Sequence, residues 1–250
     1  MNKQILTLAA GVALTASMSA QAISVNLGGV IFDPDSFFDF TANSTLYENV
    51  VGAPGDVLSG MGQITTLNAQ NQATFCPGCE LTFTFSGFTL SAISGNQVAF
   101  TGGTVNFWVD NTPDFDATNA ATAGDGNLWL QLAGHSVFNA GNGLVGTLFS
   151  TINSGTLGSG TEGGTGTGLL DVIGGLAAAN FDTDGIASSN TPADFQFTSS
   201  FQPIPNGITP DGYALFGTTD LQGNAIPEPA TLALFGAGLI GLGAFRRNKK

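Results

Sequence analysis

The chain has 250 residues, of which 18 are Asp or Glu, five are Lys or Arg and one is His, so its formal net charge is -13. The basic residues are confined to the two ends (Lys3, Arg246, Arg247, Lys249 and Lys250), and positions 4–245 contain none. This distribution excludes nucleic-acid binding, which needs cations against phosphates, and also a lysine Schiff base, a Walker-type phosphate loop and an arginine clamp on anionic substrates.

Residues 1–22 have the three parts of a secretory signal peptide. Lys3 supplies the positive charge, residues 5–14 form an apolar stretch, and Ala20-Gln21-Ala22 provides a small-x-small cleavage site. The apolar stretch is too short for a membrane-spanning anchor. We therefore expect export, with a mature chain that starts at Ile23 and a folded body over residues 23–226.

The body is rich enough in apolar residues to form a core despite its acidity, with 42% hydrophobic residues and 20 Phe in the whole chain. Apolar and polar residues alternate in short runs, and Gly, Asn, Asp and Pro separate the runs. The candidate strands are residues 23–27, 81–86, 97–100, 105–110, 128–132, 144–149, 195–198 and 213–216. This pattern predicts an all-β fold, an antiparallel, jelly-roll-like β-sandwich.

Two segments depart from the strand pattern. Residues 169–179 carry apolar side chains at three- and four-residue spacing, which predicts one short helix, although Gly174 and Gly175 weaken it. Residues 153–168 are low-complexity Gly, Thr and Ser, and either link two β units or form one long loop. We favour a single domain, because residues 187–226 alone offer too few strands for a core.

The only two cysteines lie in Cys76-Pro77-Gly78-Cys79, a spacing found in redox pairs, zinc sites and structural disulfides. A zinc site needs two more soft ligands, which one His cannot supply. A redox pair favours a helix N-terminus, whereas the neighbouring residues predict strand, turn and strand. In an oxidising compartment the sequence therefore predicts a disulfide that closes a tight turn.

His135 is the single imidazole of the chain. A Ser-His-Asp hydrolase is formally possible, but the chain contains no Gly-x-Ser-x-Gly elbow. We interpret His135 as a surface or hydrogen-bonded residue and expect that the chain is not an enzyme.

Acidic residues gather in two places. Asp110–Asp116, with Asp125 beyond it, forms an acidic loop whose carboxylates suit a glycosidase only at a separation that the sequence does not fix. Asn180, Asp182 and Asp184 resemble the first half of a Ca²⁺ loop, but Thr191 stands where an EF-hand needs a bidentate Glu. We favour a solvated turn over a metal site there, and Ca²⁺ is the ion to test.

Trp108 and Trp129 both fall opposite the aliphatic face of their predicted strands. Either indole is a candidate platform for stacking on a sugar ring, and packing against neighbouring structure is the commoner role of such residues.

The last 24 residues combine three features. Pro227-Glu228-Pro229 precedes an uncharged apolar run, residues 230–245, which Arg246 and Arg247 follow. As a helix this run reaches about 24 Å, short of the roughly 30 Å hydrocarbon core, and its four Gly weaken it further. The tail therefore predicts a transient inner-membrane helix with its basic end in the cytoplasm, and a plain single-pass anchor is the alternative.

These features, in this order, resemble a PEP-CTERM sorting signal over residues 227–250. The resemblance implies processing by an exosortase, a membrane-embedded cysteine protease-transpeptidase. Pro227, Glu228 and Pro229 would be its recognition residues, and Arg246 and Arg247 the stop. It also implies a Gram-negative bacterium that builds an exopolysaccharide matrix, and delivery to the cell surface or the biofilm.

Together these observations predict an exported cell-surface or biofilm-matrix protein with a structural or adhesive role, exosortase as a processing partner and exopolysaccharide as a candidate binding partner. A carbohydrate-binding module is the alternative, and a glycoside-active enzyme that uses the acidic loop is a third reading.

Overall fold

The computed structural model describes residues 24–34, 40–141, 143–205, 209 and 211–226. The predicted signal peptide, the sorting tail and its 230–245 helix lie outside these residues. The strands are β1 Val25–Leu27, β2 Val30–Phe32, β3 Phe40–Glu48, β4 Val57–Leu67, β5 Gln70–Asn71, β6 Glu80–Ser94, β7 Gln97–Asp110, β8 Asn127–His135, β9 Val137–Asn139, β10 Leu144–Gly146, β11 Leu148–Ser154, β12 Gly163–Gly174, β13 Phe195–Pro203 and β14 Leu215–Gly223. The helical elements are α2 Gln72–Phe75, the 3₁₀ turn η1 Ala120–Ala123 and α3 Ala178–Phe181.

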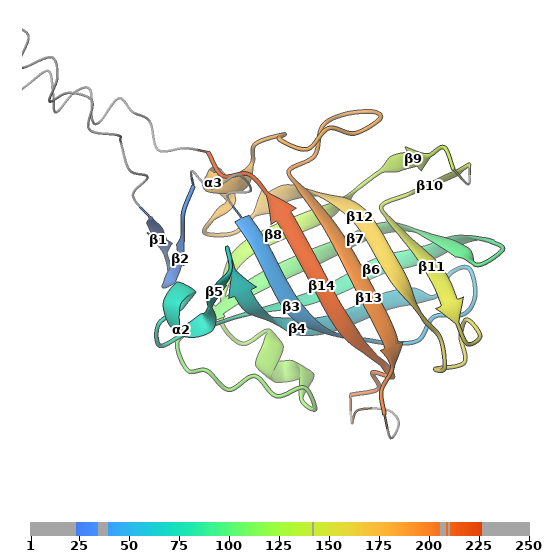
Figure 1. Cartoon of the computed structure of the whole chain (residues 1–250), viewed down its shortest axis with the longest axis horizontal. Coiled ribbons are helices and arrows are strands. Elements are labelled where there is room, and N and C mark those ends of the chain that lie inside the picture. Colours follow the sequence, from blue (N-terminus) through green and yellow to red (C-terminus); the bar gives the residue numbers. More distant parts are fainter. Residues whose placement is uncertain (1–23, 35–39, 142, 206–208, 210, 227–250) are drawn as a thin grey trace, which may run out of the picture.

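The strands form an antiparallel barrel, which confirms the all-β prediction and corrects the sandwich (Figure 1). The main sheet runs β12-β13-β14-β3-β4-β6-β7-β8, and β8 pairs back with β12 to close eight strand positions. β11 continues the position of β8, since β7 pairs with β11 through residues 97–100 and with β8 through 104–109. Long twisted strands such as β6 and β7 favour this closure, because it leaves no open edge.

Several strands could not be recognised from hydrophobic alternation, because the residues at their inward-facing positions are small or polar. In β3 the buried positions include Ala42, Ser44 and Glu48, so the hydrophobic alternation is faint. In β4, Gly60 and Gly62 lie beneath the rings of Phe85 and Phe83, where a Cβ would overlap both the ring and a β3 carbonyl oxygen. The packing therefore requires glycine at both positions.

The helix predicted over residues 169–179 is wrong. Most of that segment continues β12, with Leu170 inside the barrel and Ile173 53% exposed, and only α3 is helical. The end of the Gly-rich stretch before it, residues 163–168, is strand as well, because Gly164, Gly166 and Gly168 lie against side chains of β13. Residues 155–162 form the turn between β11 and β12. No helix within the described residues combines the length and the hydropathy that crossing a bilayer requires.

An aromatic cluster closes one end of the barrel, where Figure 1 places β1, β2 and α3. Its rings are Phe32, Phe40, Trp129, Phe181 and Phe195, with centroids 5.8 Å apart for Phe40 and Trp129 and 5.2 Å apart for Phe40 and Phe181. Along the barrel axis the interior contains a largely apolar cavity of about 70 Å³. The opposite end of the barrel lies at the C-terminal end of β3, where Glu48 pairs with Leu215.

Candidate functional site

Three carboxylates meet at the barrel end that α2 covers. Glu80 begins β6, Asp110 ends β7 directly opposite it, and Asp114 follows in the next loop. Within the described residues they are the one group of three or more potential metal-ligating side chains, and their ligand atoms lie within 4.8 Å of one another. Oxygen donors of this kind suit a hard cation such as Ca²⁺.

Glu80 is the inner member of this acidic cluster. It is buried, its Oε1 accepts the backbone N–H groups of Asp114 and Phe115 at 3.0 Å, and its Oε2 accepts the Gln63 side-chain amide at 2.9 Å. Burial raises the pKa of Glu80, the backbone N–H groups oppose that shift, and the neighbouring carboxylates Asp114 and Asp110 add to it. The pKa of the Asp114 carboxyl is likewise raised, first by desolvation and then by the negative charges of Asp125 and Asp110.

The sequence identified the acidic loop but not Glu80, because a lone Glu at the start of a strand carries no signal of burial. Asp116 belongs to a turn outside the cluster: its carboxylate accepts the N–H and the hydroxyl of Thr118, which lowers its pKa.

The residues resembling a Ca²⁺ loop are placed differently. Asn180 lies in α3, where its carbonyl oxygen accepts the Ile226 N–H at 2.7 Å, and Asp182 and Asp184 are exposed. The backbone N–H groups of Thr183 and Asp184 point to the buried carboxylate of Asp194, both at 2.7 Å. The loop thus folds around an internal acid, and the preference for a solvated turn over a Ca²⁺ site at Asn180, Asp182 and Asp184 stays a prediction.

His135 lies at the end of β8 and contacts two residues that the sequence could not identify. Its Nδ1 is 2.8 Å from Asp171 Oδ1 on β12, and its Nε2 is 3.2 Å from Ser188 Oγ in the loop after α3. His135 is 5% exposed, and the Ser188 hydroxyl donates to the carbonyl oxygen of Thr191. The expectation of a hydrogen-bonded His135 agrees with this geometry.

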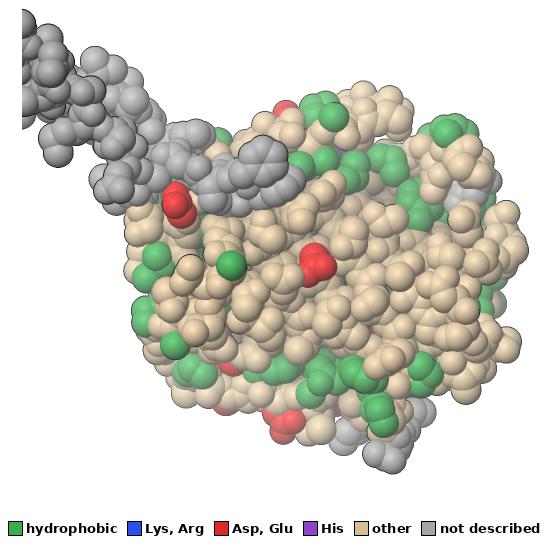
Figure 2. All heavy atoms as spheres, viewed as in Figure 1, with side chains coloured by type: hydrophobic (Ala, Val, Ile, Leu, Met, Phe, Trp, Pro, Cys, Tyr) green, Lys and Arg blue, Asp and Glu red, His purple; other side chains and the backbone are tan. Residues whose placement is uncertain are grey.

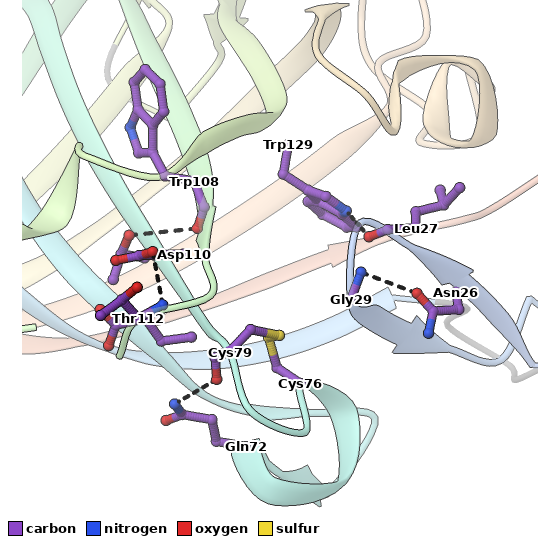
Figure 3. Close-up of a disulfide and its surroundings, with 12 residues drawn as sticks. Asn26, Leu27, Gly29, Gln72, Cys76, Cys79, Trp108, Asp110, Thr112 and Trp129 are labelled. Atoms are coloured by element: carbon purple, nitrogen blue, oxygen red, sulfur yellow. Dashed lines mark hydrogen bonds between the residues drawn. A yellow bond between two sulfur atoms is a disulfide. The ribbon is translucent and has the colours of Figure 1, made fainter. Parts of the chain in front are cut away.

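The two tryptophans differ in exposure. Trp129 is fully buried in the aromatic cluster, and its indole N–H donates to the Leu27 carbonyl at 2.9 Å (Figure 3). It presents no face to a sugar, which corrects its candidacy as a stacking platform. Trp108 is half-buried on the outside of β7 and donates to Thr84 Oγ1 at 3.0 Å.

Cys76 and Cys79 form the predicted disulfide (Figure 3). The expected strand–turn–strand context is wrong on one side, because the single turn of α2 precedes the pair and Cys76 caps its C-terminus. Both cysteines are buried, and the Gln72 side chain donates to the Cys79 carbonyl at 3.0 Å. A pair at the end of a helix lacks the N-terminal dipole that activates redox cysteines.

A polar hollow of about 460 Å³ lies on the outer face of β11–β14. Its lining includes Thr165, Thr167, Thr198, Ser200, Thr218 and Asp220, and Asp220 is its single charged side chain. Figure 2 shows a broad face on which most side chains are neither hydrophobic nor charged. Hydroxyl and amide groups donate and accept hydrogen bonds alike, as sugar hydroxyls require.

The segment that follows the barrel belongs to the class of protein-sorting signals. Residues 225–248 match the model of the PEP-CTERM protein-sorting motif, which confirms the resemblance seen in the sequence. Pro227, Glu228, Pro229, Arg246 and Arg247 all lie within the matched segment. No curated protein and no solved structure is similar enough to the chain to be matched.

Proposed function

We propose that this chain is an exported protein of the cell surface or extracellular matrix, in which the barrel has a structural or adhesive role and no catalytic one. The observation that carries the proposal is the PEP-CTERM motif, which implies exosortase processing and export toward the cell surface. Release after a transient stay in the inner membrane belongs to the same proposal.

The connection between barrel and tail supports removal of the tail after export. Ile226, the last described residue, is fixed by its hydrogen bond to Asn180 in α3. The tripeptide begins at the next position, so a cut near Pro227 leaves every described strand of the barrel in the mature chain. The barrel is expected to stay folded after the tail is lost.

The charge of the processed body supports a role outside the cell. Once residues 1–22 and 227–250 are removed, 17 carboxylates remain (18 less Glu228) with no Lys or Arg. Such a body repels its own copies at neutral pH, which keeps it dispersed until cations or uncharged polymers bridge it. Exopolysaccharide is the polymer we propose.

Cell fractionation tests the sorting step. The wild-type chain should reach the surface or matrix fraction, whereas Glu228→Ala combined with Pro229→Ala should stay with the inner membrane. Asp182→Asn, an exposed acid of the barrel, is the matched control and should sort normally. Equal distribution of all three chains would refute the proposal.

The polar hollow favours a second candidate, a carbohydrate-binding module that recognises a neutral glycan. Thr167→Ala combined with Thr198→Ala removes two hydroxyls from its lining, and Thr101→Ala, exposed on β7, is the control. Binding to a glycan array that the double variant abolishes and the control retains would support this function. An array without a bound glycan would refute it.

A further inference from the structure

The polar hollow on β11–β14 is crossed by two rows of side chains from neighbouring strands. The register of the sheet defines the first row, which consists of Thr151, Thr165, Ser200 and Thr218. The second row, two residues further along each strand, contains Thr167, Thr198 and Asp220. All of these residues line the hollow. Neighbouring strands lie about 4.8 Å apart and alternate residues of one strand about 6.7 Å apart, so the two rows form a regular grid of hydrogen-bonding groups.

The hydroxyl groups of this grid are available to a ligand. Thr165, Thr167 and Thr198 are exposed, and no hydrogen bond within the described residues uses their hydroxyl groups. Ser200 Oγ and Thr218 Oγ1 lie 3.1 Å apart and bond to each other, which fixes both side chains. Sugar hydroxyls can therefore both donate to the grid and accept from it.

The hollow has the dimensions of a site for a short stretch of polymer. Its volume of about 460 Å³ falls within the roughly 300–1,000 Å³ of ligand sites in proteins. It extends across four adjacent strands, from β11 to β14, which places the outer two roughly 14 Å apart at the usual strand spacing. Figure 1 shows β12, β13 and β14 side by side on the face that Figure 2 displays. A single sugar ring is shorter than this span, so an extended oligosaccharide fits along the rows.

Asp220 ends the second row and is the one charged residue among the described residues that line the hollow. It is half-buried, and within the described part of the chain neither a hydrogen bond nor an ion pair reaches its carboxylate. Its cross-strand neighbour Asn43 donates instead to Thr66 Oγ1 at 2.9 Å. The negative charge of Asp220 is therefore uncompensated at the edge of the hollow.

That charge selects the class of ligand. Positions 4–245 contain no Lys or Arg, so an anionic polysaccharide such as a polyuronate meets no counter-charge here and is repelled by Asp220. A protonated amine, in contrast, donates hydrogen bonds to a carboxylate, and such charge-assisted bonds are roughly twice as strong as neutral ones. One carboxylate among hydroxyls matches a largely uncharged chain with an occasional amino group.

We propose that the polar hollow binds a linear hexosamine polymer that is largely N-acetylated and carries scattered free amino groups. One amino group pairs with the Asp220 carboxylate, and the hydroxyls of the flanking sugars bond to the two rows. This inference rests on the second candidate function, glycan recognition by the hollow, and names the class of glycan.

Calorimetric titration of the purified full chain tests the pairing. The probes are a glucosamine oligomer, its fully N-acetylated counterpart of the same length and a polyuronate oligomer. At about pH 5 an amino group is protonated and an ordinary Asp carboxyl is still ionised. We expect the glucosamine oligomer to bind more tightly than the N-acetylated one, and the polyuronate not to bind. Asp220→Asn should weaken binding of the glucosamine oligomer about fivefold, as loss of an accessible ion pair does, and leave binding of the N-acetylated oligomer unchanged.

Asp182→Asn is the matched control, because it removes one exposed carboxylate outside the hollow and should leave both affinities unchanged. The inference is overturned if Asp220→Asn keeps the wild-type preference for the glucosamine oligomer, if Asp182→Asn weakens that preference equally, or if the polyuronate binds as tightly. In each of these cases glycan recognition itself stands if Thr167→Ala combined with Thr198→Ala abolishes binding of the N-acetylated oligomer. If neither the glucosamine oligomer nor its N-acetylated counterpart binds, the inference and the second candidate function both fail.

Discussion

The imidazole Nδ1 of His135 lies 2.8 Å from Oδ1 and 2.9 Å from Oδ2 of Asp171, so both carboxylate oxygens hold one ring nitrogen. With Ser188 at Nε2, the three residues stand in the order of a Ser-His-Asp triad. However, the Ser188 hydroxyl donates to the Thr191 carbonyl and the imidazole is buried. We therefore interpret the three residues as a structural hydrogen-bond network that holds loop 182–194 against the barrel.

His135→Ala is therefore expected to destabilise the protein by about 1–3 kcal/mol, because buried hydrogen-bond partners are left unmade. Hydrogen exchange should become faster in loop 182–194 and remain unchanged in β3. Ser189→Ala, exposed in the same loop, is the control. A fluorophosphonate probe that modified Ser188 in the folded protein would contradict the non-catalytic interpretation.

Glu48 should make the protein less stable as the pH rises. Its pKa is about 8 in the folded state against an ordinary value of 4.5, so its contribution is fully present below about pH 4.5 and is lost as the pH rises through about 8. The shift corresponds to at most about 5 kcal/mol. Urea unfolding in EDTA at pH 5, 7 and 9 should show the decline, and Glu48→Gln should flatten it. An unchanged slope in that variant would assign the pH dependence to other carboxyl groups.

Gly62→Ala should be strongly destabilising. Its Cβ would overlap the carbonyl oxygen of Thr45 and lie 2.5 Å from the Phe83 ring, both within the sheet. Overpacking of this kind costs about 3 kcal/mol or more where the backbone must move. Gly124→Ala is the control, since its Cβ meets its nearest neighbour, Thr84, at 3.5 Å. Equal melting temperatures for the two variants would show that β4 does not pack as described.

The disulfide should contribute modestly to the free energy of unfolding. It joins residues only three positions apart, and a loop of that length is worth about 2 kcal/mol in the chain-entropy model. Cys76→Ser combined with Cys79→Ser should lower the free energy of unfolding by that amount and leave the fold intact. Two reactive thiols in the folded exported protein would contradict the assignment.

Local pattern predicted the β class, the cysteine pair and the sorting tail, because each depends on neighbours in the chain. Trp129 shows where such a pattern fails. The register shifts between the pairs Phe107–Leu130 and Trp108–Leu128, so a bulge takes Trp129 out of the alternation and its ring joins the core. A bulge depends on the partner strand, and periodicity within one strand does not reveal it.

The closure of the barrel and the burial of the acids likewise could not be predicted from the sequence. The closing pair joins β8 to β12, and β12 reads as a Gly-rich loop followed by a helix until β13 is placed beside it. Glu48 and Glu162 are separated by more than a hundred positions and meet only when the barrel closes. Glu80 joins Asp110 and Asp114 for the same reason, through the β6–β7 pairing.

The intact mass of the protein recovered from the cell surface or matrix tests the central claim most directly. We predict a chain that starts at Ile23 and has lost most or all of residues 227–250. Recovery there of a chain that still carries Lys250 would contradict sorting by cleavage of the tail.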